Sequence, residues 1–434
     1  MKKLFWNNLN AIEKKQLLQR PLSQNKDALQ EKTQEIIREV KVQGDKALRT
    51  LTQQFDKVTL ESIRVEPQAF EEARAKVSAK ELEAIRFAIK RIGDYAQSQI
   101  PENWCYDSRD GVLCETQWRA IEKVGLYVPG GSAALVSTVM MLAVPARIAG
   151  CSVRVMCTPP AIDGCVNPYL LVAAQECAIE NVYKIGGAQA IAAMAYGTQT
   201  IPKVDKIFGP GNNWVTQAKI LCAQDAAGVS IDLPAGPSEI LIIADESANP
   251  AFVAADLLSQ AEHDKASQVF LVSLSETFVD EVKRCLETQI EKLPRQAIAI
   301  EALRQSAAII VADINQAIEI SNQYGPEHLS LQVESPRQYV SLINNAGTVF
   351  LGKWTPETLG DYVTGANHVL PTAGATRMWS GLSVLDFMKR VGIQEATKAG
   401  LKKLGPYAQC LAVIEQLGAH ENAVTVRLQE ASND

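Results

Sequence analysis

From Val124 onward, short apolar runs alternate with longer segments that have apolar residues at helical spacing. The runs VGLYVPGGS, SVRVMCTPP, NVYKIGG and KVDKIFGPG are followed by helical segments at 138–149, 168–178, 188–197 and 213–223. After VSIDLPAGPSE the pattern starts again, with EILIIAD, QVFLVSL, AAIIVAD and HLSLQV before helical segments at 250–263, 276–293, 314–324 and 336–346. Such alternation over short connections predicts parallel sheets with helices on both faces. The two blocks therefore predict an α/β fold with two nucleotide-fold-like modules.

The first and last parts of the chain lack this alternation. Residues 1–26 are polar and charged with one short helical pattern, which predicts an arm rather than a domain. Two amphipathic segments, 26–56 around Gly44 and 79–97, predict long helices. After about Leu382 the chain becomes more polar and is predicted to be helical to its end. The length of 434 residues predicts roughly two to four domains.

The composition excludes several classes of protein. Hydrophobic residues make up 47% and charged residues 21%, as in soluble globular chains, and a net charge of −6 with interspersed signs disfavours nucleic-acid binding. The start, MKKLFWNNLNAIEKK, has no apolar stretch typical of a signal peptide, and the longest apolar run, 133–146, is too short to span a bilayer. Nine cysteines without a CxxC pair argue against a disulfide framework or a thiolate zinc site. We therefore expect a cytoplasmic protein without a nucleic-acid or membrane partner.

The segment SNQYGPEHL (321–329) places a carboxylate, Glu327, beside an imidazole, His328. The preceding helix is predicted to end at Gly325, which tolerates the left-handed conformation, and Pro326 cannot continue it. HLSLQV then alternates as a strand, so the pair lies at a helix-to-strand corner, where α/β proteins often place reactive groups. The alternative is a solvated turn residue followed by a histidine that caps a strand. The chain has only four histidines, three of them beside ligand-type residues or turn glycines, which favours a functional role.

A second set of residues is a candidate metal site. Gln260 and His263 are three residues apart in a helical segment and therefore share one face. Asp361 lies in the glycine-flanked segment LGDYVTG and His420 in LGAHENAV. Mixed nitrogen and oxygen ligands without cysteine suit Zn²⁺ or Mn²⁺ in an open site. The long separations along the chain leave open the alternative that both histidines are ordinary helix residues.

Three glycine turns follow predicted strands and precede predicted helices, at 127–132, 186–189 and 208–212. At such turns backbone N–H groups can face a phosphate group. None of them matches GxGxxG or a Walker loop, so the standard dinucleotide fingerprint is absent. Each turn taken alone could instead be a tight strand-to-helix connection that needs glycine.

Long segments over nearly the whole chain resemble the histidinol dehydrogenase family, whose members catalyse the last two steps of histidine biosynthesis. The resemblance is carried by GLYVPGGSA (125–133), ARIAGC (146–151), KIGGAQAIAAMAYGT (184–198), KVDKIFGPGN (203–212), DLPAGPSE (232–239), DLLSQAEHD (256–264), EISNQYGPEHL (319–329), GDYVTGANHVLPT (360–372) and AHENAVTVRL (419–428). So many long matches in order make the resemblance specific, unlike any single glycine turn.

The resemblance implies an NAD-dependent oxidoreductase that converts L-histidinol to L-histidine through L-histidinaldehyde, reducing two NAD⁺ in turn at one Zn²⁺ site per subunit, where Mn²⁺ can substitute. It implies metal ligands at Gln260, His263, Asp361 and His420. Substrate contacts are implied at these ligands and at Ser238, His328, His368 and Glu415, and NAD contacts at Tyr127, Gln189 and Asn212. Glu327 and His328 are the implied catalytic pair. We expect His328 to accept the hydroxyl proton because imidazole titrates near neutrality, and Glu327 to activate water for the aldehyde step.

The family fold implied is a homodimer with two incomplete Rossmann-like domains and exchanged terminal segments. For this chain the resemblance implies a small helical N-terminal arm at 1–26, a discontinuous catalytic domain at 27–126 and 241–382, an inserted NAD-binding domain at 127–240, and a small C-terminal domain at 383–434. The C-terminal domain would pack on the partner subunit and bring His420 into that subunit's active site. Departures from the family at Asp264-Lys265, Met378-Trp379 and Met388 are local and bear only on the shape of the substrate pocket.

Two other interpretations make different demands on the sequence. A non-catalytic nucleotide- and metal-binding relative would keep the glycine turns but lack some catalytic residues or ligands, and none is lacking here. A dehydrogenase of another amino alcohol would keep the metal ligands. His368 and Glu415, which the resemblance assigns to the imidazole of the substrate, argue against that enzyme.

Overall fold

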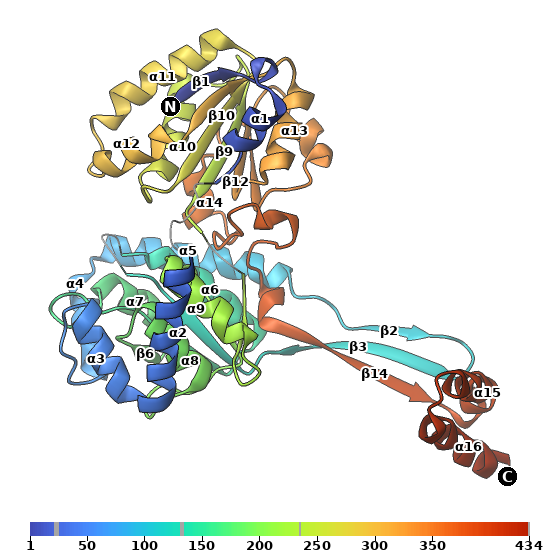
Figure 1. The fold of residues 1–434 in the computed structure, drawn as a ribbon. Coiled ribbons are helices and arrows are strands. Elements are labelled where there is room, and N and C mark those ends of the chain that lie inside the picture. Colours follow the sequence, from blue (N-terminus) through green and yellow to red (C-terminus); the bar gives the residue numbers. More distant parts are fainter. Residues whose placement is uncertain (21–25, 131–133, 234–235, 433–434) are drawn as a thin grey trace. The chain divides into compact units, whose positions relative to one another are not determined.

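The computed structural model describes residues 1–20, 26–130, 134–233 and 236–432. The chain has a mixed α/β fold that divides into two units, Met1–Gln99 with Ile121–Phe387, and Ile100–Ala120 with Met388–Asp434. The first unit contains two parallel sheets, which confirms the prediction from the alternating pattern (Figure 1). Within the described ranges, every helix is too short or too polar to cross a membrane.

The larger sheet has six parallel strands in the order β1-β11-β10-β9-β12-β13. They are β1 (Lys2–Phe5), β9 (Glu239–Ala244), β10 (Gln268–Ser273), β11 (Ala307–Ile310), β12 (His328–Gln332) and β13 (Thr348–Leu351). Successive strand residues point to opposite faces, so this sheet has two cores. Ile240 and Ile242 pack in one core with α10 (Pro250–Ala261), α11 (Glu276–Ile290) and α12 (Gln296–Arg304). Leu241 and Ile243 pack in the other core, which includes residues of α13 (Ile314–Tyr324) and α1 (Ala11–Leu17).

The smaller sheet has five parallel strands in the order β6-β5-β4-β7-β8. They are β4 (Lys123–Tyr127), β5 (Val153–Cys157), β6 (Asn181–Tyr183), β7 (Lys206–Phe208) and β8 (Ser230–Ile231). Their connections include α6 (Val136–Ala149), α7 (Pro168–Glu176), α8 (Gly187–Tyr196) and α9 (Asn213–Gln224). Numbered along the chain, the strand order is 3-2-1-4-5, that of a doubly wound fold. In such folds ligands bind where the order reverses, which here is between β4 and β7.

The helices before β4 pack against the helices that flank the five-stranded sheet, which corrects the expected grouping of 27–126 with 241–382. These helices are α2 (Lys26–Gln43), α3 (Asp45–Phe55), α4 (Pro67–Lys76) and α5 (Ala79–Ser98). Val40 of α2 and Leu48 of α3 lie in the same core as Val155 of β5, while α4 and α5 pack against α7 and α6. Helical periodicity shows that a helix has an apolar face, but it does not show which sheet that face covers.

The first residues of the chain form a strand, which corrects the expectation of a helical arm at 1–26. β1 pairs with β11 from Lys2 to Phe5, and Trp6 of η1 (Trp6–Asn8) is buried in the core that includes α13. The helical pattern of the arm is confirmed at α1. Residues 21–25 of the expected arm lie outside the described residues. A four-residue strand is too short to show a clear alternation of polar and apolar residues.

The second unit consists of an antiparallel sheet and two helices. The sheet has the order β14-β3-β2, from β2 (Trp104–Asp107), β3 (Val112–Ala120) and β14 (Met388–Ala396), and the helices are α15 (Lys398–Ile414) and α16 (Gly418–Ser432). The C-terminal part is therefore not wholly helical, and its sheet includes residues that were expected to belong to 27–126. β14 pairs with β3 along its nine residues, and pairing between segments so distant in sequence leaves no local signal. Residues 383–387, expected in this domain, belong to the first unit, where Phe387 stacks on Phe208 at 3.9 Å between ring centroids.

Candidate active site

A cavity of about 980 Å³ in the first unit is lined by residues from the ends of both parallel sheets. Most of the residues singled out from the sequence line it: Tyr127, Gln189, Asn212, Ser238, Gln260, His263, Glu327, His328, Asp361 and His368. Glu415 and His420 are exposed residues of the second unit and are not among the lining residues. Glu415 is the C-cap of α15, and His420 lies in the first turn of α16.

The predicted helix-to-strand corner at Glu327 and His328 is confirmed. α13 ends at Tyr324, Gly325 has the left-handed φ of 62°, and β12 begins at His328. The corner lies at the amino end of β12, whereas the chemistry of open parallel sheets usually lies at the carboxyl ends. Both side chains are nevertheless buried and line the cavity.

One hydrogen bond sets the tautomer of the His328 ring. Nδ1 lies 3.0 Å from the backbone carbonyl oxygen of Glu239, the first residue of β9. A carbonyl oxygen can only accept, so Nδ1 carries the proton and Nε2 carries the lone pair in the neutral ring. Nε2 is buried, has no hydrogen-bond partner among the described residues, and lies 3.9 Å from Oδ1 of Asp361.

Burial shifts the two residues of the corner in opposite directions. It lowers the pKa of His328 to about 3 and raises the pKa of Glu327 well above its usual value. The expectation that His328 titrates near neutrality is therefore wrong, because the sequence does not show that the ring is buried. His328 is a neutral imidazole at neutral pH, and its free Nε2 can accept a proton or bind a metal ion.

The end of α10 and the short helix α14 (Glu357–Tyr362) bring further ligand-type groups to the same place. Gln260 lies in the last turn of α10 and His263 in the turn that follows the helix, and both line the cavity. Gln260 Nε2 donates a hydrogen bond to Oε1 of Glu357. Ligand atoms of His328, Glu357 and Asp361 all lie within 4.8 Å of one another. Glu357 was missed from the sequence; its only signal was a position one helical turn before Asp361.

These residues fit a bound divalent cation. Oε1 of Gln260 and Nε2 of His328 are buried acceptors without a hydrogen-bond partner among the described residues. Burial raises the pKa of Asp361 to about 6 and raises that of Glu357, and a bound cation would favour the ionised form of both acids. Nitrogen and oxygen donors without thiolate are a set that Zn²⁺ or Mn²⁺ accepts.

The opposite side of the cavity is the carboxyl end of the five-stranded sheet, where a nucleotide is expected to bind. At the end of β4, the hydroxyl of Tyr127 accepts a hydrogen bond of 3.0 Å from the backbone N–H of Gly187. Gly187 begins α8, which also contains the buried Gln189. Asn212 caps α9 through Oδ1, which accepts from two backbone N–H groups. Two helix N-termini thus meet at this end of the sheet, an arrangement that suits phosphate groups.

A Cβ atom at Gly209 would lie 2.1 Å from the carbonyl oxygen of Tyr127, so the 208–212 turn requires glycine there. Gly131 and Ser132 of the glycine turn at 127–132 lie outside the described residues.

Ser238 and His368 line the space between the two sides. Ser238 directly precedes β9; Pro234 and Ala235 of the same motif lie outside the described residues. The loop of His368 is held against α6 by its neighbour Asn367, whose Nδ2 donates to the carbonyl oxygen of Met141 at 2.7 Å. Burial lowers the pKa of His368 to about 4, so its ring is neutral at neutral pH.

The chain is similar over its whole length to known proteins. A family model described as histidinol dehydrogenase matches residues 18–428. The histidinol dehydrogenase of Vibrio vulnificus (strain CMCP6) is 48% identical over 430 residues, which cover 99% of both chains. That of Xanthomonas campestris pv. campestris (strain ATCC 33913) is 49% identical over 432 residues, which cover 100% of both. The crystal structure of histidinol dehydrogenase from Elizabethkingia anophelis has a TM-score of 0.96 and 45% sequence identity, and covers 100% of this chain and 99% of that chain.

Proposed function

The chain belongs to the histidinol dehydrogenase family of oxidoreductases, and from this premise we propose that it oxidises L-histidinol to L-histidine through L-histidinaldehyde, with Zn²⁺ and NAD. The observation that carries the proposal is the gathering of Gln260, His263, Glu327, His328 and Asp361 around one cavity. The overall oxidation removes four electrons, so two hydrides and two NAD⁺ are needed for each histidinol.

In the first oxidation we assign the proton transfer to His328. Its Nδ1 proton is held by the carbonyl oxygen of Glu239, which leaves Nε2 free to accept the hydroxyl proton of the alcohol. The low pKa of the ring keeps Nε2 unprotonated before the reaction. The alcohol carbon then gives up its hydride to the cofactor, and the product of this step is the aldehyde.

In the second oxidation the aldehyde needs water before it can lose another hydride. We assign the activation of that water to Glu327, whose burial raises its affinity for a proton. His328 again accepts a proton as the hydrated aldehyde gives up its hydride. The product is the carboxylate of L-histidine, and the electrons leave as a second hydride.

The metal site is proposed at Gln260, His263, Asp361 and His420. When bound, Zn²⁺ or Mn²⁺ supplies a centre that orients the imidazole and amino nitrogens of the substrate. Ser238, His368 and Glu415 are proposed to contact the substrate, and Tyr127, Gln189 and Asn212 to contact NAD. Gln260, His263 and Asp361 line one side of the cavity and the proposed NAD contacts line the other, with Ser238 and His368 between them. Glu415 and His420 belong to the second unit.

We propose that the enzyme is a homodimer in which His420 and Glu415 complete the active site of the partner subunit. The support is the surface of α15, α16 and the turn that joins them. Large apolar side chains are exposed there, which is typical of an interaction surface: Tyr407, Leu411, Val413, Ile414, Leu417 and Val426. The nine free cysteines support a reducing compartment, and we place the enzyme in the cytoplasm.

The test is the stoichiometry of the reaction with and without added Zn²⁺. We expect two NADH and one L-histidine for each L-histidinol consumed, and loss of turnover when the metal is removed. A ratio of one NADH with release of free aldehyde would refute the second oxidation. Preferential oxidation of a different amino alcohol would refute the assignment of substrate.

A further inference from the structure

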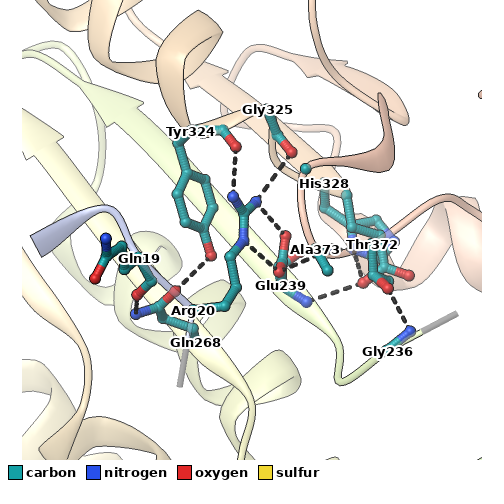
Figure 2. Close-up of polar contacts among 12 residues, drawn as sticks. Gln19, Arg20, Gly236, Glu239, Gln268, Tyr324, Gly325, His328, Thr372 and Ala373 are labelled. Atoms are coloured by element: carbon teal, nitrogen blue, oxygen red, sulfur yellow. Dashed lines mark hydrogen bonds and ion pairs between the residues drawn. The ribbon is translucent and has the colours of Figure 1, made fainter. Parts of the chain in front are cut away.

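An ion pair joins the N-terminal segment to the start of β9, near the candidate catalytic residue His328 (Figure 2). Nε and Nη2 of Arg20 donate to the two carboxylate oxygens of Glu239, at 2.8 Å and 2.9 Å. The Glu239 side chain is only 3% exposed and that of Arg20 is 21% exposed, so the carboxylate of the pair is buried. A bidentate contact between guanidinium and carboxylate fixes the orientation of both groups.

Glu239 also holds both candidate catalytic side chains through its main chain. Its backbone N–H donates to Oε2 of Glu327 at 2.9 Å, and its carbonyl oxygen accepts from Nδ1 of His328 at 3.0 Å. Its carboxylate accepts a further hydrogen bond of 3.1 Å from the backbone N–H of Ala373. The carboxylate that pairs with Arg20 and the peptide groups that orient Glu327 and His328 therefore belong to one residue.

Arg20 makes a second set of contacts, with the end of α13. Nη1 donates to the carbonyl oxygen of Tyr324 at 2.8 Å and Nη2 to that of Gly325 at 3.1 Å, and the guanidinium lies 3.8 Å from the centre of the Tyr324 ring. Carbonyl groups at a helix C-terminus lack partners within the helix and attract a positive charge. Glu327 follows two residues after Gly325, so Arg20 holds together the two segments that carry Glu239 and Glu327.

We propose that Arg20 and Glu239 are positioning residues, which keep Glu327 and His328 aimed into the cavity without touching the substrate. This inference deepens the proposed function and rests on it. Loss of Arg20 leaves a buried carboxylate without its counter-charge, which favours a shift of the start of β9 that brings this carboxylate to water. Displacement of reacting groups by about 1 Å can cost about 10²-fold in rate.

The test compares Arg20→Met and Arg20→Lys with the wild type. We expect Arg20→Met to lower kcat about 10–100-fold for both oxidations, with KM for histidinol and NAD changed less than about 3-fold. The kcat of Arg20→Lys should lie between those of Arg20→Met and the wild type, since lysine restores the charge but not the planar guanidinium group. A purely structural ion pair would instead change stability and leave kcat in place.

Arg377→Met is the matched control. Arg377 donates to the carbonyl oxygens of Gln323 and Gly374, so it binds the end of the same helix but makes no hydrogen bond to Glu239 among the described residues. We expect Arg377→Met to keep kcat within about 3-fold of wild type. Equal loss of kcat in Arg20→Met and Arg377→Met would overturn the inference, and so would an unstable Arg20→Met with full kcat. If Arg20→Met does not fold, Glu239→Gln decides, because glutamine keeps the shape and the backbone contacts and should lower kcat in the same way.

Turnover of histidinol by the wild type separates the two proposals. If the wild type does not oxidise histidinol, the proposed function fails, and the positioning role is then judged by ¹⁵N spectra of histidine-labelled protein. The chain has only four histidines, and a spectrum of His328→Gln assigns the signal of His328. The positioning role requires the Nδ1-protonated form of His328 in the wild type and a mixture of forms in Arg20→Met. An unchanged His328 signal in Arg20→Met would overturn it.

Discussion

Replacing Lys219 with methionine should destabilise the protein by about 3–5 kcal/mol and weaken the binding of NAD, because it removes one half of a buried ion pair. Nζ of Lys219 donates to Oδ1 of Asp232 and to the carbonyl oxygens of Gly209, at 2.9 Å, and Leu233, at 3.1 Å. Oδ2 of Asp232 accepts from the backbone N–H of Gly209 at 2.7 Å. The pair thus holds the glycine turn that leads to Asn212.

The size of the expected destabilisation follows from the burial of the Lys219–Asp232 pair. The side chains of Lys219 and Asp232 are 2% and 1% exposed, so the carboxylate left by the substitution has no water to replace its partner. Methionine matches the length and apolar stem of lysine, so the loss of packing is small. Two carbonyl oxygens also lose a donor, at about 1 kcal/mol each. Because the turn is no longer held, we expect weaker NAD binding as well as lower stability.

Denaturant unfolding at one fixed protein concentration measures the stability, and titration with NAD⁺ measures the affinity. Arg86→Met is the control: Arg86 pairs with Glu176, but its side chain is 59% exposed, so its loss should cost less than about 1 kcal/mol. The double variant Lys219→Met with Asp232→Asn should recover part of the loss, since asparagine removes the unpaired charge and can still accept from Gly209. A cost for Lys219→Met no larger than that of the control would refute the reasoning.

Three further predictions concern the chemistry. Glu327→Gln should lower oxidation of histidinaldehyde about 10²–10⁴-fold and slow the alcohol step less, since only the aldehyde step needs an activated water; equal losses from the two substrates would contradict this division. A chelator should abolish turnover and Zn²⁺ or Mn²⁺ should restore it while NAD still binds, and full activity of protein shown by elemental analysis to be metal-free would exclude the site. Subunit exchange between the inactive variants His263→Ala and His420→Ala should restore about a quarter of wild-type activity, because about half of the dimers are mixed and one of their two sites is intact. No recovery, with mixed dimers seen by mass spectrometry, would mean that His420 does not act across the interface.

The features that sequence analysis predicted correctly depend on signals a few residues long. Gly325 and Pro326 end α13 and allow β12 to start at His328, because glycine tolerates the left-handed conformation and proline cannot continue a helix. The short separation of Gln260, in the last turn of α10, and His263, just after the helix, brings both to the same cavity. Alternation of strand and helix predicted both parallel sheets for the same local reason.

The features that were missed depend on contacts between distant segments. The pairing of β1 with β11 and of β3 with β14 is set by tertiary packing, which a local pattern does not encode. In the sequence, the segment ETLGDY does not distinguish Glu357 from an acid on the surface. Only the fold shows that Glu357 is buried beside Asp361. The lowered pKa of His328 has the same origin, because its cause is burial.

The pairing of β1 has a consequence for how the protein is made on the ribosome. β1 is the first strand to be synthesised, but Lys2 lies opposite Ala307, so its partner follows about 300 residues later. At about 5–20 residues per second this delay is roughly 15–60 s, during which every strand of the five-stranded sheet is synthesised. β1 therefore lacks its partner strand β11, and Arg20 its partners Glu239 and Tyr324, during much of translation. The six-stranded sheet is complete only after β11, one of its last strands to be synthesised, has paired with β1, the first. An N-terminal tag or deletion therefore acts on a late step of assembly.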